Sequence, residues 1–455
     1  MKAGLPPVWD PRGRKGCKKE KCYWIGLRTL PINCRLSGRE WLKSKVSVVK
    51  IPLKSWDEEV FEGVRRSIDL IGGPERFAKP GEKVLIKPNI VFGDRRWSVD
   101  RRVLYSVAKI FVDLGCDVVI GENPLVNTNS REEFEKYGME DVAKRAGARF
   151  VDFRRDEHVT VKVENARGCE TLRIAKTVLD ADCVVSVPVM RAHGLCMVSL
   201  SIKNLWGTIP PTQRHIGHRK SLNWTLAELN KIVGTKLAVI DGTTVMGAPH
   251  VGLKPLGVII AGDDPVATDS IATIRMGYDP YRIEHIRYAH ELGVGEIDPE
   301  KIEIIGSTLE EIREIGRKEG RRIFRLKGYN TDPRRLLKRA RNVEVVMGNP
   351  CSSCLYKLTV AIKSLGIDKI SEGPEMAIIV GPEAKPVPGK VNIILGGCLK
   401  KYADQGIFVD FCPVYDQDVK QGILMALGEI EEPRWLWERI LESYRKKEDE
   451  SLPGF

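Results

Sequence analysis

Residues 183–188 read Cys-Val-Val-Ser-Val-Pro, a run of mostly β-branched residues that ends at a proline. Valine favours an extended backbone, and the proline ends the strand because it lacks the N–H that a central ladder needs. Both faces of the run carry apolar or small side chains, which predicts a strand that is buried on both sides. Such strands are typical of parallel sheets covered by helices.

Similar apolar runs alternate with helical patterns along the chain. The predicted strands cover residues 46–51, 84–87, 118–121, 237–241 and 257–261, and the predicted helices cover residues 57–70, 100–114 and 132–146. This order predicts an α/β fold with a mostly parallel sheet covered by helices, followed by a smaller C-terminal α/β domain. Ligands of such sheets bind beyond the carboxyl ends of the strands.

Changes in composition divide the chain into five segments. These are a basic N-terminal extension (1–45), an α/β core (46–306), a basic helical connector (307–342), a four-cysteine domain (343–430) and a C-terminal helix with a tail (431–455).

The overall composition is that of a globular protein, with 42% hydrophobic and 29% charged residues in 455. The sequence has no run of 18 apolar residues and no apolar segment near Met1, so we expect a cytoplasmic protein without membrane insertion. Eleven cysteines, an odd number, indicate reduced thiols rather than a disulfide framework. Scarce glutamine with abundant Lys, Arg and Glu resembles a heat-adapted composition.

Two segments carry most of the positive charge. Residues 1–50 contain 13 Lys and Arg against 3 Asp and Glu, and residues 313–341 contain 12 against 3. Basic arms of this kind can bind nucleic acid, but no aromatic residues interleave with the charges, and this partner is not favoured. We expect residues 313–341 to pack as a helical connector, because their apolar residues need burial: Ile315, Ile323, Phe324 and Leu326.

Four cysteines in the last quarter have the spacing of a metal or iron–sulfur site. Cys351 and Cys354 form a C-x-x-C pair, Cys398 follows a Gly-Gly dipeptide after an apolar run, and Cys412 precedes a proline. The proline after the last cysteine favours a 4Fe-4S cluster, with zinc as the alternative ligand and buried structural cysteines as a third interpretation. The uneven spacing of Cys17, Cys22 and Cys34 is a weak pattern for a further metal site.

A candidate catalytic site lies in the basic segment 191–220. His193 follows a predicted buried strand and can move protons near neutral pH, while Lys203 can act as a point charge or nucleophile. We expect a small anionic ligand there. The predicted ligand-binding residues are Lys87, Asn89, Arg191, Asn204, His215, His218, Asp241 and Asp269. We predict that His193, Lys203 and Asn204 share one pocket with Lys87 and Asn89, and that Asp264 caps a helix.

The motifs around these residues resemble a known family. From about residue 46 to residue 305 the chain resembles the family called domain of unknown function 362, on five matches: Ile86-Lys87-Pro88-Asn89, 182–188 with His193, Lys203-Asn204 with Gly207, Asp241-Gly242, and 263–269. Members often carry iron–sulfur cysteine motifs, and the family has no assigned activity. This resemblance therefore implies a cluster in the appended domain.

A second, weaker resemblance is to the N-terminal half of nickel-pincer lactate racemases. His193 and Lys203 keep that family's interval of ten positions between a histidine and a cofactor-bearing lysine. The glycine-rich segment around the racemase lysine is replaced here by residues 201–207. The resemblance therefore implies the location of a site and not its chemistry.

Three functional hypotheses follow. The leading one is a cytoplasmic iron–sulfur oxidoreductase, or an enzyme linked to an electron-transfer protein, that acts on a small anion at the α/β core. The second is a racemase- or lyase-like enzyme with His193 as acid and base and a structural metal domain. The third is a nucleic-acid-binding protein that uses its basic arms. The sequence does not identify the substrate, the electron partner or the oligomeric state.

Overall fold

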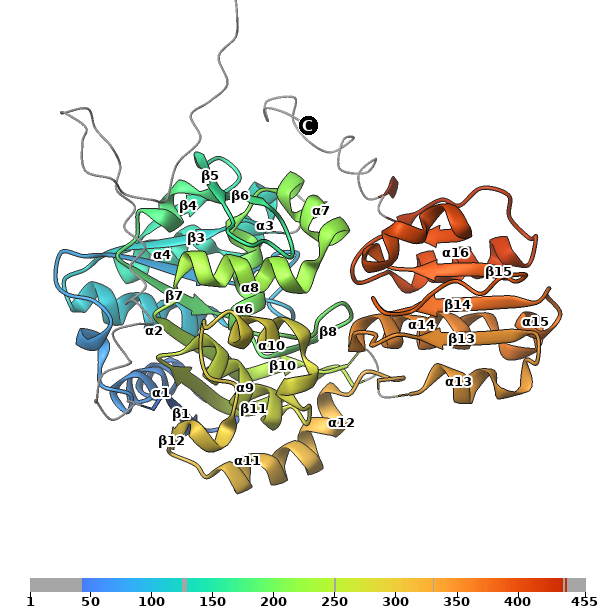
Figure 1. The fold of residues 1–455 in the computed structure, drawn as a ribbon. Helices are drawn as coiled ribbons and strands as arrows, with labels where there is room; N and C mark the ends of the chain where they lie inside the picture. The colour runs from blue at the N-terminus through green and yellow to red at the C-terminus, as the bar shows by residue number, and fades with distance from the viewer. Residues whose placement is uncertain (1–42, 125–128, 249–250, 330, 437, 440–455) are drawn as a thin grey trace, which may run out of the picture.

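A computed structural model describes residues 43–124, 129–248, 251–329, 331–436 and 438–439 (Figure 1). Its core is an eight-stranded sheet. The strand order is β12 (Glu303–Ile305), β1 (Lys45–Lys50), β11 (Leu253–Gly262), β10 (Leu237–Met246), β7 (Cys183–Val187), β2 (Lys83–Pro88), β3 (Asp117–Glu122) and β4 (Arg149–Asp152). Only the pairs of β11 with β1 and β10 are antiparallel. The predicted mostly parallel α/β sheet is therefore confirmed.

Helices cover both faces of this sheet, because alternate strand residues point to opposite sides. Val84 and Ile86 pack with one group of helices, and Leu85 packs with the other. The first group is α1 (Asp57–Asp69), α2 (Arg101–Asp113), α3 (Ser130–Tyr137) and α4 (Met139–Ala146). The second is α6 (Ser201–Asn204), α8 (Leu222–Val233), α9 (Pro265–Arg275) and α10 (Glu284–Glu291).

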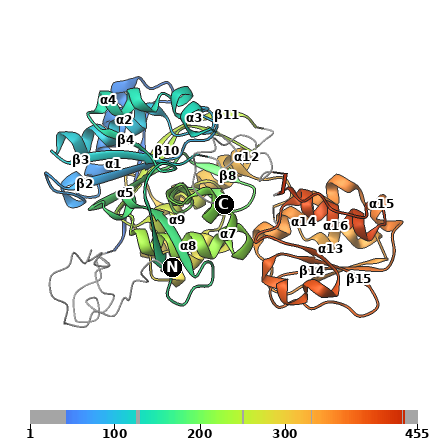
Figure 2. The same ribbon diagram turned by 90° about the horizontal axis from the view of Figure 1, so that it is seen from above.

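Shorter elements connect the strands and helices of this core. They are the pair β5 (His158–Lys162) and β6 (Thr171–Ala175), the helix α5 (Lys176–Leu179), the hairpin β8 (Arg191–His193) with β9 (Met197–Ser199), and the helix α7 (Pro211–Lys220). The β8–β9 hairpin and α7 lie on the side of the core that faces the C-terminal domain (Figures 1 and 2).

The single helix predicted over residues 132–146 is wrong. Two helices, α3 and α4, meet at Gly138, whose φ of 79° ends the first helix and starts the second. Glycine adopts this left-handed conformation without the steric penalty that a Cβ brings. The apolar periodicity continues across the break, which is why the pattern read as one helix.

The C-terminal domain is a second, smaller sheet beside the core (Figure 2). Its four parallel strands run in the order β13 (Val343–Met347), β14 (Met376–Val380), β15 (Val391–Leu395) and β16 (Ile407–Val409). The helices α14 (Ser352–Leu365), α15 (Ile367–Ser371) and α16 (Asp416–Ala426) accompany them, and the 3₁₀ segment η8 (Gly397–Gln405) follows β15. The predicted smaller α/β domain is therefore present.

The basic connector is a series of short helices that pack first on the core and then on the C-terminal domain. It contains α11 (Leu309–Ile315), the π-helical turn η6 (Gly316–Gly320), α12 (Arg321–Phe324) and α13 (Pro333–Leu336). Ile323, Phe324 and Leu326 are buried as predicted, and Ile315 is half-buried. Several of its cations form ion pairs with carboxylates: Arg313 with Glu300, Arg317 with Glu310, Lys318 with Glu314 and Arg334 with Asp332.

The predicted C-terminal helix falls almost wholly outside the described residues, as do Cys17, Cys22, Cys34 and most of the N-terminal extension. Among the helices that are described, none is both long and apolar enough to cross a membrane.

Gly316 lets the backbone of the connector lie against the backbone of α9. A Cβ on Gly316 would stand 2.0 Å from the Ile274 carbonyl oxygen at the end of α9. Alanine in a helical position is normally more stable than glycine by about 0.5–1 kcal/mol. For Gly316→Ala we expect the opposite, a loss of about 1–3 kcal/mol from forced backbone displacement. Thermal unfolding measures it, and Lys318→Ala on the exposed side of the same turn is the control, expected to change stability by at most about 0.5 kcal/mol.

Candidate functional site

A buried ion pair joins the carboxyl ends of β2 and β3. Lys87 Nζ lies 2.7 Å from Glu122 Oε1, and both side chains are almost fully buried. Lys87 also donates to the Pro88 carbonyl at 2.6 Å, and its own carbonyl accepts a hydrogen bond from Asn204 Nδ2 at 2.6 Å. Burial lowers the pKa of Lys87, and the Glu122 carboxylate opposes that shift. Lys87 and Asn204 are thus close together as predicted, but they are bonded to the protein itself.

Asn89 and Asp241 hold neighbouring loops at the same sheet edge. Asn89 Oδ1 accepts the Val189 N–H at 2.7 Å. Asp241 accepts the Asp100 N–H at 2.7 Å and both the N–H and the hydroxyl of Thr243. Burial, followed by the charge of Asp100, raises the pKa of Asp241. Both residues therefore have structural bonds, and their role toward a ligand stays a prediction.

Asp269 caps a short helix from the interior of another. Its carboxylate accepts the Ser201 N–H at 2.8 Å, the Ser201 hydroxyl at 2.5 Å and the Ile202 N–H at 2.9 Å. Burial raises the pKa of Asp269 to about 7. The carboxylate thereby fixes the start of α6, the helix that carries Lys203. The predicted helix cap at Asp264 is confirmed, since it accepts the N–H groups of Val266 and Ala267.

Five basic side chains gather where the core meets the C-terminal domain. We call Arg191, His193, Lys203, His218 and Lys357 the interdomain basic cluster. Burial is the main cause that lowers the pKa of His193, and the charges of Lys203, Arg191 and Lys357 lower it further. Lys357, on α14, stands 3.3 Å from where a Cβ on Gly194 would be. The structure therefore brings the predicted pair His193 and Lys203 together and adds Lys357 from the other domain.

Two cations of this cluster lack an acidic partner. In the described part of the chain, no carboxylate lies within ion-pair distance of Arg191 or Lys203, and Arg191 Nε is buried without a hydrogen bond. Burial lowers the pKa of Arg191 to about 10 and that of Lys203 to about 8. Burying a charge without a partner costs free energy. An anion bound beside Arg191 and Lys203 would therefore be stabilised.

His193 has a defined hydrogen-bonding state. Its Nδ1 lies 3.1 Å from the Leu195 N–H and accepts that hydrogen bond, which places the proton of the neutral ring on Nε2. Burial, followed by the charge of Lys203, holds its pKa well below the ordinary value. The imidazole is therefore neutral at pH 7 and presents its Nε2–H as a hydrogen-bond donor. His215 and His218 on α7 are also neutral, because burial lowers their pKa values to about 4 and about 3.

The four C-terminal cysteines face one another across three segments. Cys351 caps α14, and its sulfur accepts the Cys354 N–H at 3.4 Å. The hydrogen bond to Cys351 and burial raise the pKa of Cys354, and the thiols Cys398 and Cys412 add to that rise. Burial, then Cys351 and Cys398, raises the pKa of Cys412. The mutual effects place all four thiols within electrostatic range.

Within the described ranges, no three His, Cys, Asp or Glu side chains form a group that could hold a single metal ion. Cys398 is exposed, Cys351 and Cys412 are half-buried, and Cys354 is buried. The four-cysteine group therefore lies at the edge of its domain, open on the Cys398 side.

Backbone hydrogen bonds attach this cysteine group to the core. The Cys412 N–H donates to the His218 carbonyl at 2.8 Å, and the Leu222 N–H donates to the Cys412 carbonyl at 2.8 Å. On the other side, Glu284 of α10 accepts the Ser352 N–H at 2.7 Å. His218 belongs to the interdomain basic cluster, and Cys412 belongs to the four-cysteine group. The interdomain basic cluster and the four-cysteine group are therefore neighbours.

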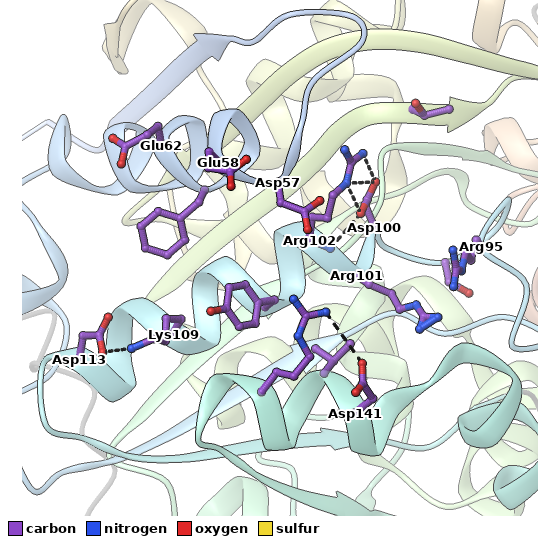
Figure 3. Close-up of a pocket in the computed structure, with 16 residues that line it drawn as sticks. Asp57, Glu58, Glu62, Arg95, Asp100, Arg101, Arg102, Lys109, Asp113 and Asp141 are labelled. Carbon is purple, nitrogen blue, oxygen red and sulfur yellow. Dashed lines mark hydrogen bonds and ion pairs between the residues drawn. The ribbon is translucent and has the colours of Figure 1, made fainter.

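A separate cavity of about 850 Å³ runs between α1, α2 and α4. Its walls carry charges of both signs, including Asp57, Arg101, Arg102 and Arg145 (Figure 3). None of the predicted site residues lines it. Asp241 touches its rim only through the hydrogen bond to Asp100, one of the lining residues.

Sequence reasoning missed four residues of the site: Glu122, Cys196, Glu284 and Lys357. Glu122 stands in the triplet Glu-Asn-Pro at a predicted strand end, a signal that could have paired it with Lys87. The other three had no signal, because a single residue in a distant helix or loop acquires its role only when the domains pack.

The class that this geometry defines is an α/β protein with a cluster of basic side chains between its core and an attached domain that carries four cysteines. Residues 84–273 match the family described as Domain of unknown function (DUF362), the family that the sequence motifs resemble. The chain is 27% identical over 243 residues to the thylakoid-associated protein sll1697 of Synechocystis, covering 51% of this chain and 74% of that one. The lactate racemase apoprotein from Thermoanaerobacterium thermosaccharolyticum is similar over 84% of this chain and 81% of its own, with 13% identity and a TM-score of 0.36.

Replacing the Asp269 carboxylate should destabilise the first turn of α6, the helix that carries Lys203. For Asp269→Asn we expect a loss of about 1–3 kcal/mol, because the amide cannot accept all three hydrogen bonds at the start of α6. Thermal unfolding measures the loss, and Asp368→Asn, at an exposed position of α15, is the control. Unchanged stability together with lost ligand binding would instead make Asp269 a direct ligand contact.

Proposed function

We propose that this chain is an iron–sulfur oxidoreductase whose cluster exchanges electrons with a small anion bound at the interdomain basic cluster. The observation that carries the proposal is the adjacency of two groups: four cysteines on one side of the interface and cations without carboxylate partners on the other.

The donor set fits an iron–sulfur cluster. Four thiols come from the start of α14 and from two loops, and the N-terminus of a helix favours thiolate charge. A zinc ion needs all its sulfurs about 2.3 Å from one point, whereas a four-iron cluster spreads its thiolates over four metals. When bound, the cluster would supply one-electron chemistry.

The basic cluster supports an anionic ligand. Arg191 and Lys203 offer charge that no described carboxylate neutralises, and His193 offers the Nε2–H of a neutral imidazole as a hydrogen-bond donor. The Cys412 N–H donates to the carbonyl of His218, a member of this cluster, so the ligand and the redox centre would be close together.

The first test concerns the cluster ligands. After anaerobic purification we expect about four iron and four sulfide per chain. Single Ser substitutions at Cys351, Cys354, Cys398 or Cys412 should remove most of the iron and the absorbance near 400 nm. Cys196→Ala is the matched control, because this thiol is a close neighbour that belongs to the core. Zinc without sulfide, or iron that depends on Cys196 and not on Cys412, would contradict the assignment.

The second test concerns the anion. Binding of inorganic phosphate or acetate, measured by calorimetry, should weaken as the pH rises through about 8, because Lys203 has a pKa of about 8 and loses its charge above it. Lys203→Met should weaken binding about tenfold or more at pH 7 and flatten this pH dependence. Lys231→Met, at an exposed position of α8, should leave both unchanged. Equal binding by all three proteins would exclude Lys203 from the site.

A further inference from the structure

We infer that the surface around Cys398 is the docking site of a small acidic electron-transfer protein. The inference rests on the proposed function, because it assigns to the iron–sulfur centre a side from which electrons arrive. The Cys398 side is the open one: Cys398 is exposed, and the other three cysteines are half-buried or buried.

Two elements from different domains meet at this surface. A Cβ on Gly397 would stand 2.7 Å from the Arg219 carbonyl and 3.7 Å from the Lys220 carbonyl, so the end of α7 lies directly against the residue before Cys398. Arg219 also forms an ion pair with Asp410 at 2.7 Å, two residues before Cys412. The core and the cysteine loops thus form one continuous rim.

The rim carries exposed positive charge. Lys220 and Lys400 are exposed and form no ion pair with any described carboxylate, and Lys401 is exposed with its Nζ 4.9 Å from the centre of the Tyr402 ring. Ile216 of α7 adds an exposed apolar side chain, at 45%. Redox encounters use small interfaces in which complementary charge steers a fast approach. A rim of lysines around a partly exposed thiol ligand therefore fits an acidic partner.

The electron balance of the encounter is simple. One electron leaves the reduced partner, which is oxidised, and enters the centre, which is reduced. No bond forms or breaks between the two proteins, and no proton is transferred.

The test uses the full chain with its centre and a reduced plant-type ferredoxin as an acidic probe in anaerobic stopped flow. Charges act over about 30 Å at 0.01 M salt and about 3 Å at 1 M. We expect Lys220→Glu/Lys400→Glu to slow reduction by ferredoxin tenfold or more at low salt and to match the unmodified protein at high salt. Reduction by dithionite should be equal in both.

The matched control carries the same charge change at the far end of the domain. Lys338 and Lys363 are both exposed, and Lys363 lies near the end of α14 opposite to Cys351. Lys338→Glu/Lys363→Glu should retain the rate of the unmodified protein. Equal slowing in both double variants, or none in either, would overturn the docking site. So would nucleic-acid binding that the Lys220 and Lys400 changes abolish while the ferredoxin rate stays the same. A chain without a reducible centre would instead refute the proposed function itself.

Discussion

Two backbone hydrogen bonds join the C-terminal domain to the core. One runs from the Cys412 N–H to the His218 carbonyl, and the other runs from the Leu222 N–H to the Cys412 carbonyl. They attach a cysteine loop to the junction between α7 and α8, as a strand pairs with its neighbour. Because main-chain groups carry the contact, it fixes the position of the loop whatever side chains surround it. The hydrogen bond from the Ser352 N–H to Glu284 and the ion pair of Arg219 with Asp410 add further contacts between the two domains.

Buried charges are compensated at the sheet edge but not at the domain interface. At the edge, Lys87 and Glu122 form a buried ion pair with further hydrogen bonds, the condition under which buried charges are tolerated. At the interface, Arg191 and Lys203 are shielded without such compensation. The first arrangement stabilises the carboxyl ends of the strands as a rigid platform, and the second leaves electrostatic potential available for a ligand.

Hydrogen bonds between helices also fix the position of the basic cluster. Asp269 in α9 holds the first turn of α6, and α6 presents Lys203 to the interface. In the C-terminal domain, Lys357 Nζ donates a hydrogen bond to Asp416 Oδ1 at 2.6 Å, which restricts the position of that ammonium group. The basic cluster is thus held from both domains, a common property of sites built on rigid elements.

The sequence by itself determined the α/β class, most strand positions and the local roles of short motifs. Apolar runs such as residues 183–187 and the Asp264 cap depend on neighbours in the chain, so their patterns are readable from it. Only the tertiary structure decided that Lys87 pairs with Glu122, that residues 132–146 break at Gly138, and that Lys357 joins His193. The first and the last of these outcomes depend on contacts between residues far apart in sequence, and the break depends on one left-handed backbone angle. The apolar periodicity of the sequence contains information on neither.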